Sequence, residues 1–467
     1  MISRRGVIKN CLASLVAVKV PTSAFSAKNV SSYRIIAQKS EHQFYEGANL
    51  SDLFLYNGSS PGPLIVENKG NILEVEFLNL LDEPSSIHWH GIRNLNDMDG
   101  VPGLTQAPVE PGETFTYRFP LNDAGTFWYH SHSQAWNQVA RGLCGPLIVL
   151  EDESSMSDRD LIIAVDDWLL DENEQIHTAS LGSLHDWSHG GRLGNFLTIN
   201  GKSAPEIKIP KSGKVHLRFL NFANARVMQF ELNDRLPMRI FALDGAPCDP
   251  FMRQRLTLAP AQRVDVQIDD VSFVRELFEV STGEEYGAAT FVPNEVTQKP
   301  NALPRFVLPT NNMLKMDNAE VINIHMQGGA MGNLSSAIFE GEQKSLRELA
   351  RSEKKLWAFN GEIGGYDLTL AEVDLGKTVV LRVWNDTRWQ HGMHLHGHHF
   401  WVKSKEFGDE ANLVLRDTYL MQPGEHAELV FEANNPGSWL FHCHMLEHHV
   451  SGTVSYTHLT LPTICSV

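Results

Sequence analysis

Three adjacent residues near the C-terminus, His442, Cys443 and His444, could place metal sites on both faces of one strand. Side chains alternate between faces in an extended strand, so both imidazoles would point one way and the thiol the other. Thiolate sulfur suits a copper ion that cycles between Cu(II) and Cu(I), and imidazole suits copper, zinc or iron. An electron arriving at Cys443 would be one peptide unit from a metal held by either histidine. The sequence therefore predicts metal-based electron transfer.

Four His-x-His pairs could supply further ligands. They are His88/His90, His130/His132, His394/His396 and His442/His444. A strand projects both imidazoles of such a pair to one face, so eight imidazoles could hold a three-metal cluster. His391, Cys443 and His448 would form a separate site with a weak axial position, which is the blue-copper pattern. A lone His-x-His pair is more often a surface feature or part of a zinc site, but four pairs in duplicated sequence are not expected by chance.

Two internal repeats indicate how the chain positions these residues. Residues 70–79, 213–221 and 376–385 each read as a turn glycine followed by an alternating strand. Pro-Gly-Glu at 111–113 precedes Gly125 and His130 with the spacing at which Pro-Gly-Glu at 423–425 precedes Gly437 and His442. We therefore expect the first and last parts of the chain to be related domains that carry the metal ligands.

Short segments rich in Val, Ile, Leu, Phe and Thr alternate with Gly, Pro, Asn and Asp, which predicts an all-β protein. We predict three consecutive Greek-key β-sandwich domains, at residues 30–155, 156–308 and 315–454, with the metal chemistry in the outer two. One helix is expected at residues 342–356, and residues 300–312 are a candidate linker.

The motifs HWHG at 88–91, WYHSH at 128–132, HGMHLHGHHF at 391–400 and HCHMLEH at 442–448 resemble the four copper motifs of the multicopper oxidases, the laccase-like enzymes. The resemblance spans nearly the whole chain and implies three cupredoxin-like domains and four copper ions. By position it implies a type 1 copper on His391, Cys443 and His448, a type 2 copper on His88 and His394, and a type 3 pair on His90, His130, His132, His396, His442 and His444.

The same resemblance implies a reaction. A substrate would give single electrons to the type 1 copper, and dioxygen would take four of them at the other three coppers and leave as water. Asp99 resembles the family's carboxylate near the type 2 copper and is a candidate proton donor or base; the alternative is an ordinary turn aspartate. Glu447 is expected to assist on the type 3 side, although His449 stands where many relatives carry an acid.

Two positions depart from the family pattern. Gly392 follows His391 where proline is usual. Thr453 stands at the axial position, ten residues beyond Cys443, where relatives usually carry Met or an apolar residue. We interpret residues 454–467 as a non-native tail and Thr453 as lying at its junction.

The sequence leaves the reducing substrate open. A phenol or aromatic amine is favoured, because no Met-rich insertion is visible. Oxidation of Cu(I) would need soft ligands, for which the candidates are Met313, Met316, Met326 and Met331, although their spacing also fits core strands. His185, Trp187 and His189 could line an entrance or lie in a surface loop. A non-catalytic copper-binding or scaffold protein of the same fold is the remaining alternative.

Composition limits the partners and the location. The net charge of −17 excludes nucleic acid and anionic membranes as favoured partners. Residues 1–27 contain Arg4-Arg5 before an apolar stretch, which resembles a twin-arginine export signal; the alternative is an ordinary Sec signal. Either signal predicts a periplasmic or secreted protein. No later apolar run is long enough to span a bilayer. Cys144 and Cys248 could pair or remain thiols.

Overall fold

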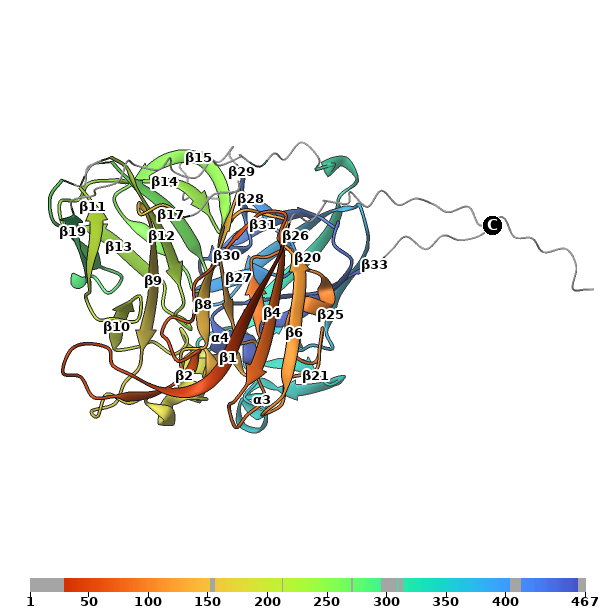
Figure 1. The fold of residues 1–467 in the computed structure, drawn as a ribbon. Coiled ribbons are helices and arrows are strands. Elements are labelled where there is room, and N and C mark those ends of the chain that lie inside the picture. Colours follow the sequence, from red (N-terminus) through yellow and green to blue (C-terminus); the bar gives the residue numbers. More distant parts are fainter. Residues whose placement is uncertain are drawn as a thin grey trace, which may run out of the picture.

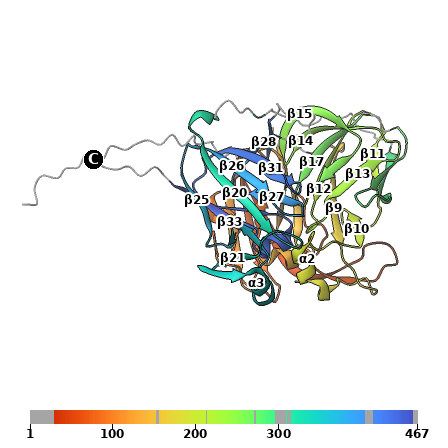
Figure 2. The same ribbon diagram turned by 180° about the vertical axis from the view of Figure 1, so that it is seen from behind.

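Three β-sandwiches make up the computed structural model, which describes residues 29–151, 156–211, 213–269, 272–294, 309, 314–403 and 413–460. The strands of the first sandwich (red to orange) face the viewer in Figure 1, and those of the third (cyan to blue) face the viewer in Figure 2. The second sandwich (yellow to green) lies to one side of both. The prediction of consecutive cupredoxin-type, all-β domains is confirmed.

The first two sandwiches each consist of two sheets. The strands of the first are β1 (Val30–His42), β2 (Ser51–Tyr56), β3 (Ile65–Asn68), β4 (Ile72–Asn79), β5 (His88–His90), β6 (Thr114–Pro120), β7 (Gly125–His130) and β8 (Cys144–Leu150). Those of the second are β9 (Asp160–Trp168), β10 (Phe196–Ile199), β11 (Glu206–Pro210), β12 (Val215–Asn221), β13 (Met228–Leu232), β14 (Met238–Leu243), β15 (Ala246–Arg253), β16 (Leu256–Leu258), β17 (Arg263–Ile268), β18 (Arg275–Glu279) and β19 (Tyr286–Asn294).

The third sandwich pairs a large sheet with a smaller one that carries the thiol strand. Its strands are β20 (Glu320–Gly328), β21 (Ser336–Phe339), β22 (Glu342–Ser345), β23 (Trp357–Phe359), β24 (Glu362–Ile363), β25 (Thr369–Asp374), β26 (Thr378–Asn385), β27 (His391–Leu395), β28 (Phe400–Lys403), β29 (Leu413–Arg416), β30 (Thr418–Met421), β31 (His426–Glu432), β32 (Gly437–Cys443) and β33 (Val454–Thr460). The α-helices in the described part of the chain are short: α1 (Ala135–Gln138), α2 (Leu184–Ser188), α3 (Leu346–Ser352) and α4 (Leu446–Val450). The smaller sheet has the order β25-β33-β32-β27-β30.

The three copies of the sequence repeat form equivalent strands in the three sandwiches. β4, β12 and β26 each pair in parallel with the first strand of their own sandwich, β1, β9 and β20. Each also pairs antiparallel with a later strand, β6, β17 or β31. In β4, Leu73, Val75 and Phe77 are buried, whereas Glu74 and Glu76 point away from the core. Period-two alternation therefore builds each core from one face of this strand.

Two segments of the third sandwich differ from, or add to, what the sequence predicts. The helix expected at residues 342–356 is shorter, because β22 occupies Glu342–Ser345 and the Ser345 hydroxyl caps α3 by accepting from the Glu348 N–H (3.2 Å). Residues 454–460 form β33, which pairs antiparallel with β32 and parallel with β25. The interpretation of this segment as non-native stays a prediction, as do the domain limits. The leader and most of the expected linker lie outside the described residues.

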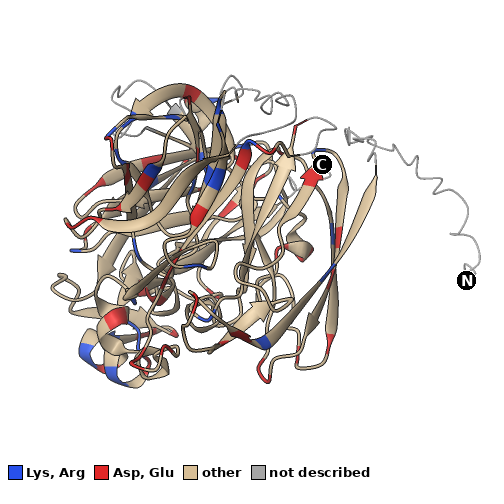
Figure 3. Cartoon of the chain, turned by 60° about the vertical axis from the view of Figure 1, so that its left-hand side comes forward, with Lys and Arg blue, Asp and Glu red and all other residues tan. Residues whose placement is uncertain are grey.

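Charged side chains are interspersed over the ribbon in the view of Figure 3. Among the described residues, no helix is long and apolar enough to cross a membrane. Cys144 and Cys248 are both free thiols, the first buried and the second partly buried.

Candidate metal centre

The histidine pairs of the first and third sandwiches come together at the ends of four strands. β5 pairs with β7 so that His88 lies opposite His130, and β27 pairs with β32 so that His394 lies opposite His442. Only His88/His90 lies wholly within a strand; in the other three pairs one histidine follows the strand's last residue. All eight imidazoles are buried.

Five groups of side chains have potential ligand atoms within 4.8 Å of one another. They are His88/His90/His394, His90/His130/His444, His132/His396/His442, His391/Cys443/His448 and His88/Asp99/His396. These groups contain all eleven predicted ligands. The first and third sandwiches both contribute to the histidine cluster. His90 lies within reach of both the predicted type 2 pair and the predicted type 3 residues, so the assignment of individual ligands to type 1, type 2 and type 3 coppers stays a prediction.

Opposed nitrogen lone pairs show that this cluster fits metal ions. His396 Nδ1 donates to Asp99 Oδ2 (2.7 Å) and His442 Nδ1 donates to the Cys443 carbonyl oxygen (2.9 Å). Both Nε2 atoms of the neutral rings therefore carry lone pairs, yet they lie 3.0 Å apart. Two acceptors at that distance repel each other unless a cation lies between them. His130 Nε2 and His444 Nε2 lie 3.4 Å apart, and His444 Nδ1 is buried without a hydrogen-bond partner.

Other ring nitrogens lack protein partners. His88 Nε2, His90 Nδ1, His394 Nε2 and His391 Nδ1 are buried without a hydrogen bond. Burial and neighbouring histidines hold the pKa values of His90, His394 and His391 well below the usual value, so these rings are neutral and can bind metal. Buried polar atoms left unpaired are costly, and a bound metal would remove that cost.

The thiol site lies on the other face of β32. Cys443 Sγ is 3.8 Å from His448 Nδ1, and the His391 and His448 ring centroids are 4.6 Å apart. Burial raises the pKa of Cys443 to about 12, so the thiol would stay protonated at neutral pH without a cation. Two imidazoles and one thiolate are the donor set of a blue-copper site. Thr453 adjoins it, donating its N–H to the His448 carbonyl and accepting from the Cys443 N–H, both at 3.0 Å.

Known proteins share both the motifs and the fold. Multicopper oxidase domain families match residues 38–154, 159–271 and 340–457. Laccase-1 of Cryptococcus neoformans var. neoformans serotype D is 28% identical over 482 aligned residues, which cover 86% of this chain and 76% of that protein. The multicopper oxidase of Pseudomonas thermotolerans superposes with a TM-score of 0.76 at 28% identity, covering 92% of this chain and 99% of the other. Lac15 from a marine microbial metagenome has a TM-score of 0.69 at 34% identity, covering 91% of this chain and all of its own.

The chain belongs to the multicopper oxidase family. It is a copper-dependent oxidase that uses dioxygen and a reducing substrate. The histidine cluster and the Cys443 site are the places where its residues fit copper.

Asp99 orients two histidines of the oxidase. Its backbone carbonyl accepts from His88 Nδ1 (2.7 Å), and its carboxylate accepts from His396 Nδ1 (2.7 Å). The carboxylate is fully buried, and its Oδ1 has no hydrogen-bond partner. Asp99 is thus a residue that contacts two predicted ligands, and Oδ1 lies 3.4 Å from His88 Nδ1. Its predicted role as a proton donor or base stays a prediction.

Glu447 faces the second sandwich. Its carboxylate accepts from Asn224 Nδ2 (3.0 Å), and burial raises its pKa to about 7. The structure thus gives it a contact that joins the third sandwich to the second, and the predicted assistance on the type 3 side stays a prediction.

Asp417 was not predicted from the sequence. Like Asp99, it contacts two histidines of the cluster, one through its backbone carbonyl. Its carbonyl accepts from His394 Nδ1 (2.8 Å), and its Oδ1 lies 3.3 Å from His90 Nε2. Burial alone would raise its pKa, but the Arg263 guanidinium outweighs burial and lowers it to about 2. The signal that the sequence offers is the charged pair Arg416-Asp417, which follows the apolar residues 413–415.

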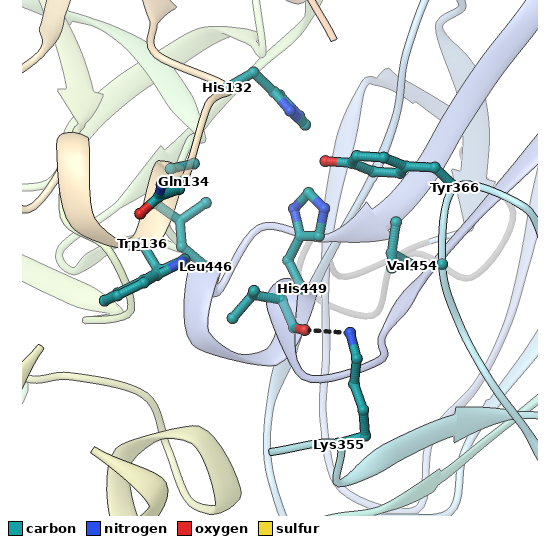
Figure 4. Close-up of a pocket in the computed structure, with 11 residues that line it drawn as sticks. His132, Gln134, Trp136, Lys355, Tyr366, Leu446, His449 and Val454 are labelled. Atoms are coloured by element: carbon teal, nitrogen blue, oxygen red, sulfur yellow. Dashed lines mark hydrogen bonds between the residues drawn. The ribbon is translucent and has the colours of Figure 1, made fainter. Parts of the chain in front are cut away.

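A cavity of about 280 Å³ opens beside the cluster, as Figure 4 shows. His449 lines it, and the His449 ring centroid is 4.3 Å from that of His442 and 5.3 Å from that of His132. His449 lies between His132 and Lys355 in this view, and Tyr366 also lines the cavity. Lys355 Nζ donates to the Val450 carbonyl oxygen (2.9 Å). His449 is therefore a buried neighbour of the cluster.

The candidate soft ligands differ in their exposure to solvent. Met326 is buried in the core of the third sandwich, whereas Met316 and Met331 are 52% and 70% exposed. Met313 lies outside the described residues. Met326 therefore cannot line an entrance.

Proposed function

We propose that this protein is a laccase-like oxidase that couples one-electron oxidation of phenols or aromatic amines to four-electron reduction of dioxygen to water. It would hold four copper ions, one at the Cys443 site and three in the histidine cluster. Bound copper would supply the one-electron chemistry at both places. The laccase among the relatives supports the choice of organic reductant.

One observation carries this proposal. Cys443 lies between His442, which belongs to the group with His132 and His396, and His444, which belongs to the group with His90 and His130. One residue of β32 thus joins the thiol site to both halves of the type 3 set through its two peptide bonds. A binding or storage protein has no need for that connection.

The protein's own residues have separate tasks in this reaction. Asp99 and Asp417 fix the orientation of His88, His396 and His394 through their Nδ1 atoms. Burial of every histidine in the cluster excludes bulk water. The partnerless Oδ1 of Asp99 is positioned to hold a proton needed for water formation.

Copper content, colour and oxygen uptake test the proposal together. We expect about four coppers per chain, a strong blue thiolate-to-copper band, and one dioxygen consumed for every four molecules of 2,6-dimethoxyphenol oxidised by one electron. A colourless copper-loaded protein, or peroxide as the product, would contradict it.

We also propose that the protein is exported, on the strength of Arg4-Arg5 and the apolar stretch that follows. Expression with the leader should place the mature chain outside the cytoplasm, and Arg4→Lys/Arg5→Lys should retain it inside. Equal export of both forms would argue for a route that does not read the arginine pair.

A further inference from the structure

A second cavity, of about 280 Å³, lies within the second sandwich, and none of the predicted copper ligands lines it. Asp167 of β9 and Phe196 of β10 border it from one sheet, whereas Glu279 of β18 and Tyr286 of β19 border it from the other. The cavity therefore lies between the two sheets, and β9, β10 and β19 are at the left of Figure 1. Its volume suits a small ligand with one ring and a short chain.

Glu279 is a buried carboxylate without a cationic partner. The residue is 4% exposed, and its Oε1 accepts from the Gln229 N–H (3.0 Å) and the Ser281 N–H (2.9 Å). These two donors stabilise a negative charge on the carboxylate. Among the residues that the structure describes, none donates to its Oε2 and none forms an ion pair with it. A buried charge is costly unless it is paired, so a cationic ligand would remove that cost.

Asp167 and Arg226 form another polar part of the lining. Asp167 Oδ2 accepts from Arg226 Nε (2.8 Å) and from the Gly194 N–H (2.6 Å). The Asp167 side chain is 3% exposed, and its Oδ1 has no hydrogen-bond partner. Because Arg226 is paired with Asp167, the charged side chains that line the cavity leave one net negative charge, that of Glu279.

Apolar side chains supply the rest of the lining. Phe196 and Leu197 of β10 and the ring of Tyr286 border the cavity. Tyr286 is 52% exposed, so a ligand can reach this side of the cavity from solvent. The face of a tyrosine ring attracts a nearby cation. Glu284 and Glu285, both exposed, immediately precede Tyr286, and their charges would raise the local concentration of cations.

We propose that this cavity binds a small arylalkyl ammonium ion, whose ammonium group donates to Glu279 Oε2 and whose ring packs against the apolar wall. A bare metal ion fits less well, because the groups of close potential metal ligands in the described chain include neither Asp167 nor Glu279. An anionic ligand would meet the unpaired charge of Glu279. This site does not depend on the proposed oxidase chemistry, and it stands if the enzyme oxidises no phenol.

Three probes with the same phenyl ring separate the ligand classes: 2-phenylethylamine, 2-phenylethanol and 3-phenylpropionate. Each would be titrated calorimetrically into the copper-loaded full chain at pH 7. We expect the amine to bind at one site per chain and at least about tenfold more tightly than the other two, because it alone supplies a cation to Glu279. The visible spectrum should not change, since no predicted copper ligand lines the cavity. Equally tight binding of the alcohol or the carboxylate, or a spectral change that indicates amine on copper, would overturn the proposal.

Variants test the assigned contacts. Glu279→Gln keeps an oxygen for both backbone donors and removes the charge, so affinity for 2-phenylethylamine should fall by about tenfold or more. Glu276→Gln is the matched control: it makes the same change at an exposed position of β18, and affinity should stay within about twofold. Tyr286→Ala, at an exposed position, should weaken binding by about two- to fivefold. Parent-like binding by Glu279→Gln or, should that variant not fold, by Tyr286→Ala would overturn the proposal.

Discussion

The side chain and the backbone of Cys443 have different roles. Its sulfur lies 3.8 Å from His448 Nδ1 and accepts from the Met445 N–H (3.4 Å), so the thiol is held in place before any metal binds. Its peptide bonds lead to His442 and His444, which face the cluster. The residue is therefore both a ligand and the link between sites.

Cys443→Ser separates these roles. Serine keeps the backbone link but is a hard, poorly ionised donor, so we expect loss of the blue band and of phenol oxidation with the fold intact. Visible and circular dichroism spectra, with oxygen uptake, measure the three properties. The control is Cys144→Ser, which removes a buried thiol in β8 and should leave the colour unchanged. Retained turnover in Cys443→Ser would refute the assigned route.

Asp99 is testable through its two functions. Asp99→Asn keeps an oxygen that can accept from His396 Nδ1, so copper should still bind, but turnover should fall because no carboxylate can hold the proton. Asp99→Ala removes the acceptor as well and should weaken copper binding by about 10- to 100-fold. Copper analysis and kcat on both variants decide this. Full turnover in Asp99→Asn would leave Asp99 only an orienting role.

At the scale of elements, the outer sandwiches position the site by placing strand ends opposite one another. Register sets His88 against His130 and His394 against His442, and Met393 against Cys443. The repeat of Gly and alternating apolar residues made β4, β12 and β26 predictable, because this alternation is a local property of sequence, although β12 is buried at every residue.

Other features depended on contacts between distant segments and were not predictable. Asp417 acquires its role from Arg263 and His90, which are 154 and 327 residues away in sequence. The helix at residues 342–356 was overestimated, because helix-forming residues alone do not show that β22 pairs with β21. The ligand histidines were identifiable because four His-x-His motifs carry their own spacing.

Residues 454–460, which form β33, are structurally important whether or not they are native to the protein. It pairs with β32 along Gly437–His442 and buries Val454 and Leu459. Burial of such side chains contributes about 1.5–3 kcal/mol each, a large part of a typical stability of about 5–15 kcal/mol. A chain ended after Thr453 should therefore unfold at a lower temperature or fail to accumulate, whereas one ended after Thr460 should match the full chain in differential scanning calorimetry. Equal stability of both would show that β33 is dispensable.

At the scale of the molecule, the three sandwiches are joined by buried polar contacts as well as by the metal sites. Arg263 of the second sandwich donates through both Nη atoms to the two carboxylate oxygens of Asp417 in the third. Thr126 of the first sandwich donates to Asp265 of the second (2.8 Å). Copper would add ligands shared between the first and third sandwiches. A metal that binds only the folded chain stabilises it by mass action.

Copper removal should therefore lower the unfolding temperature, and the change should reverse when copper is restored. Differential scanning calorimetry of the chelator-treated and reloaded protein measures this. Cys443→Ser serves as a control, since it should retain the part of the effect that belongs to the histidine cluster. An unfolding temperature independent of copper would argue against ligands that bridge two sandwiches.

Asp265 provides the acid-sensitive contact between the first two sandwiches. Burial alone would raise its pKa, but Arg218, with Nη1 3.3 Å away, outweighs burial and lowers it. A lowered folded-state pKa means that the charged carboxylate stabilises the fold above its unfolded pKa of about 3.9, and that this contribution is lost as the pH falls through the lower folded value. Asp265→Asn should thus cost about 1.5–3 kcal/mol at pH 7, because it removes the charged acceptor that faces Arg218 Nη1 while the guanidinium keeps its pair with Asp160 (2.6 Å), and much less near pH 3. Asp269→Asn is the matched control: its pair with Lys214 is exposed and 3.9 Å apart, so it should cost less than about 1 kcal/mol at either pH. Urea unfolding at both pH values measures the differences, and an Asp265→Asn cost that does not shrink in acid would show that the charge of Asp265 does not contribute through its pair with Arg218 inside the second sandwich.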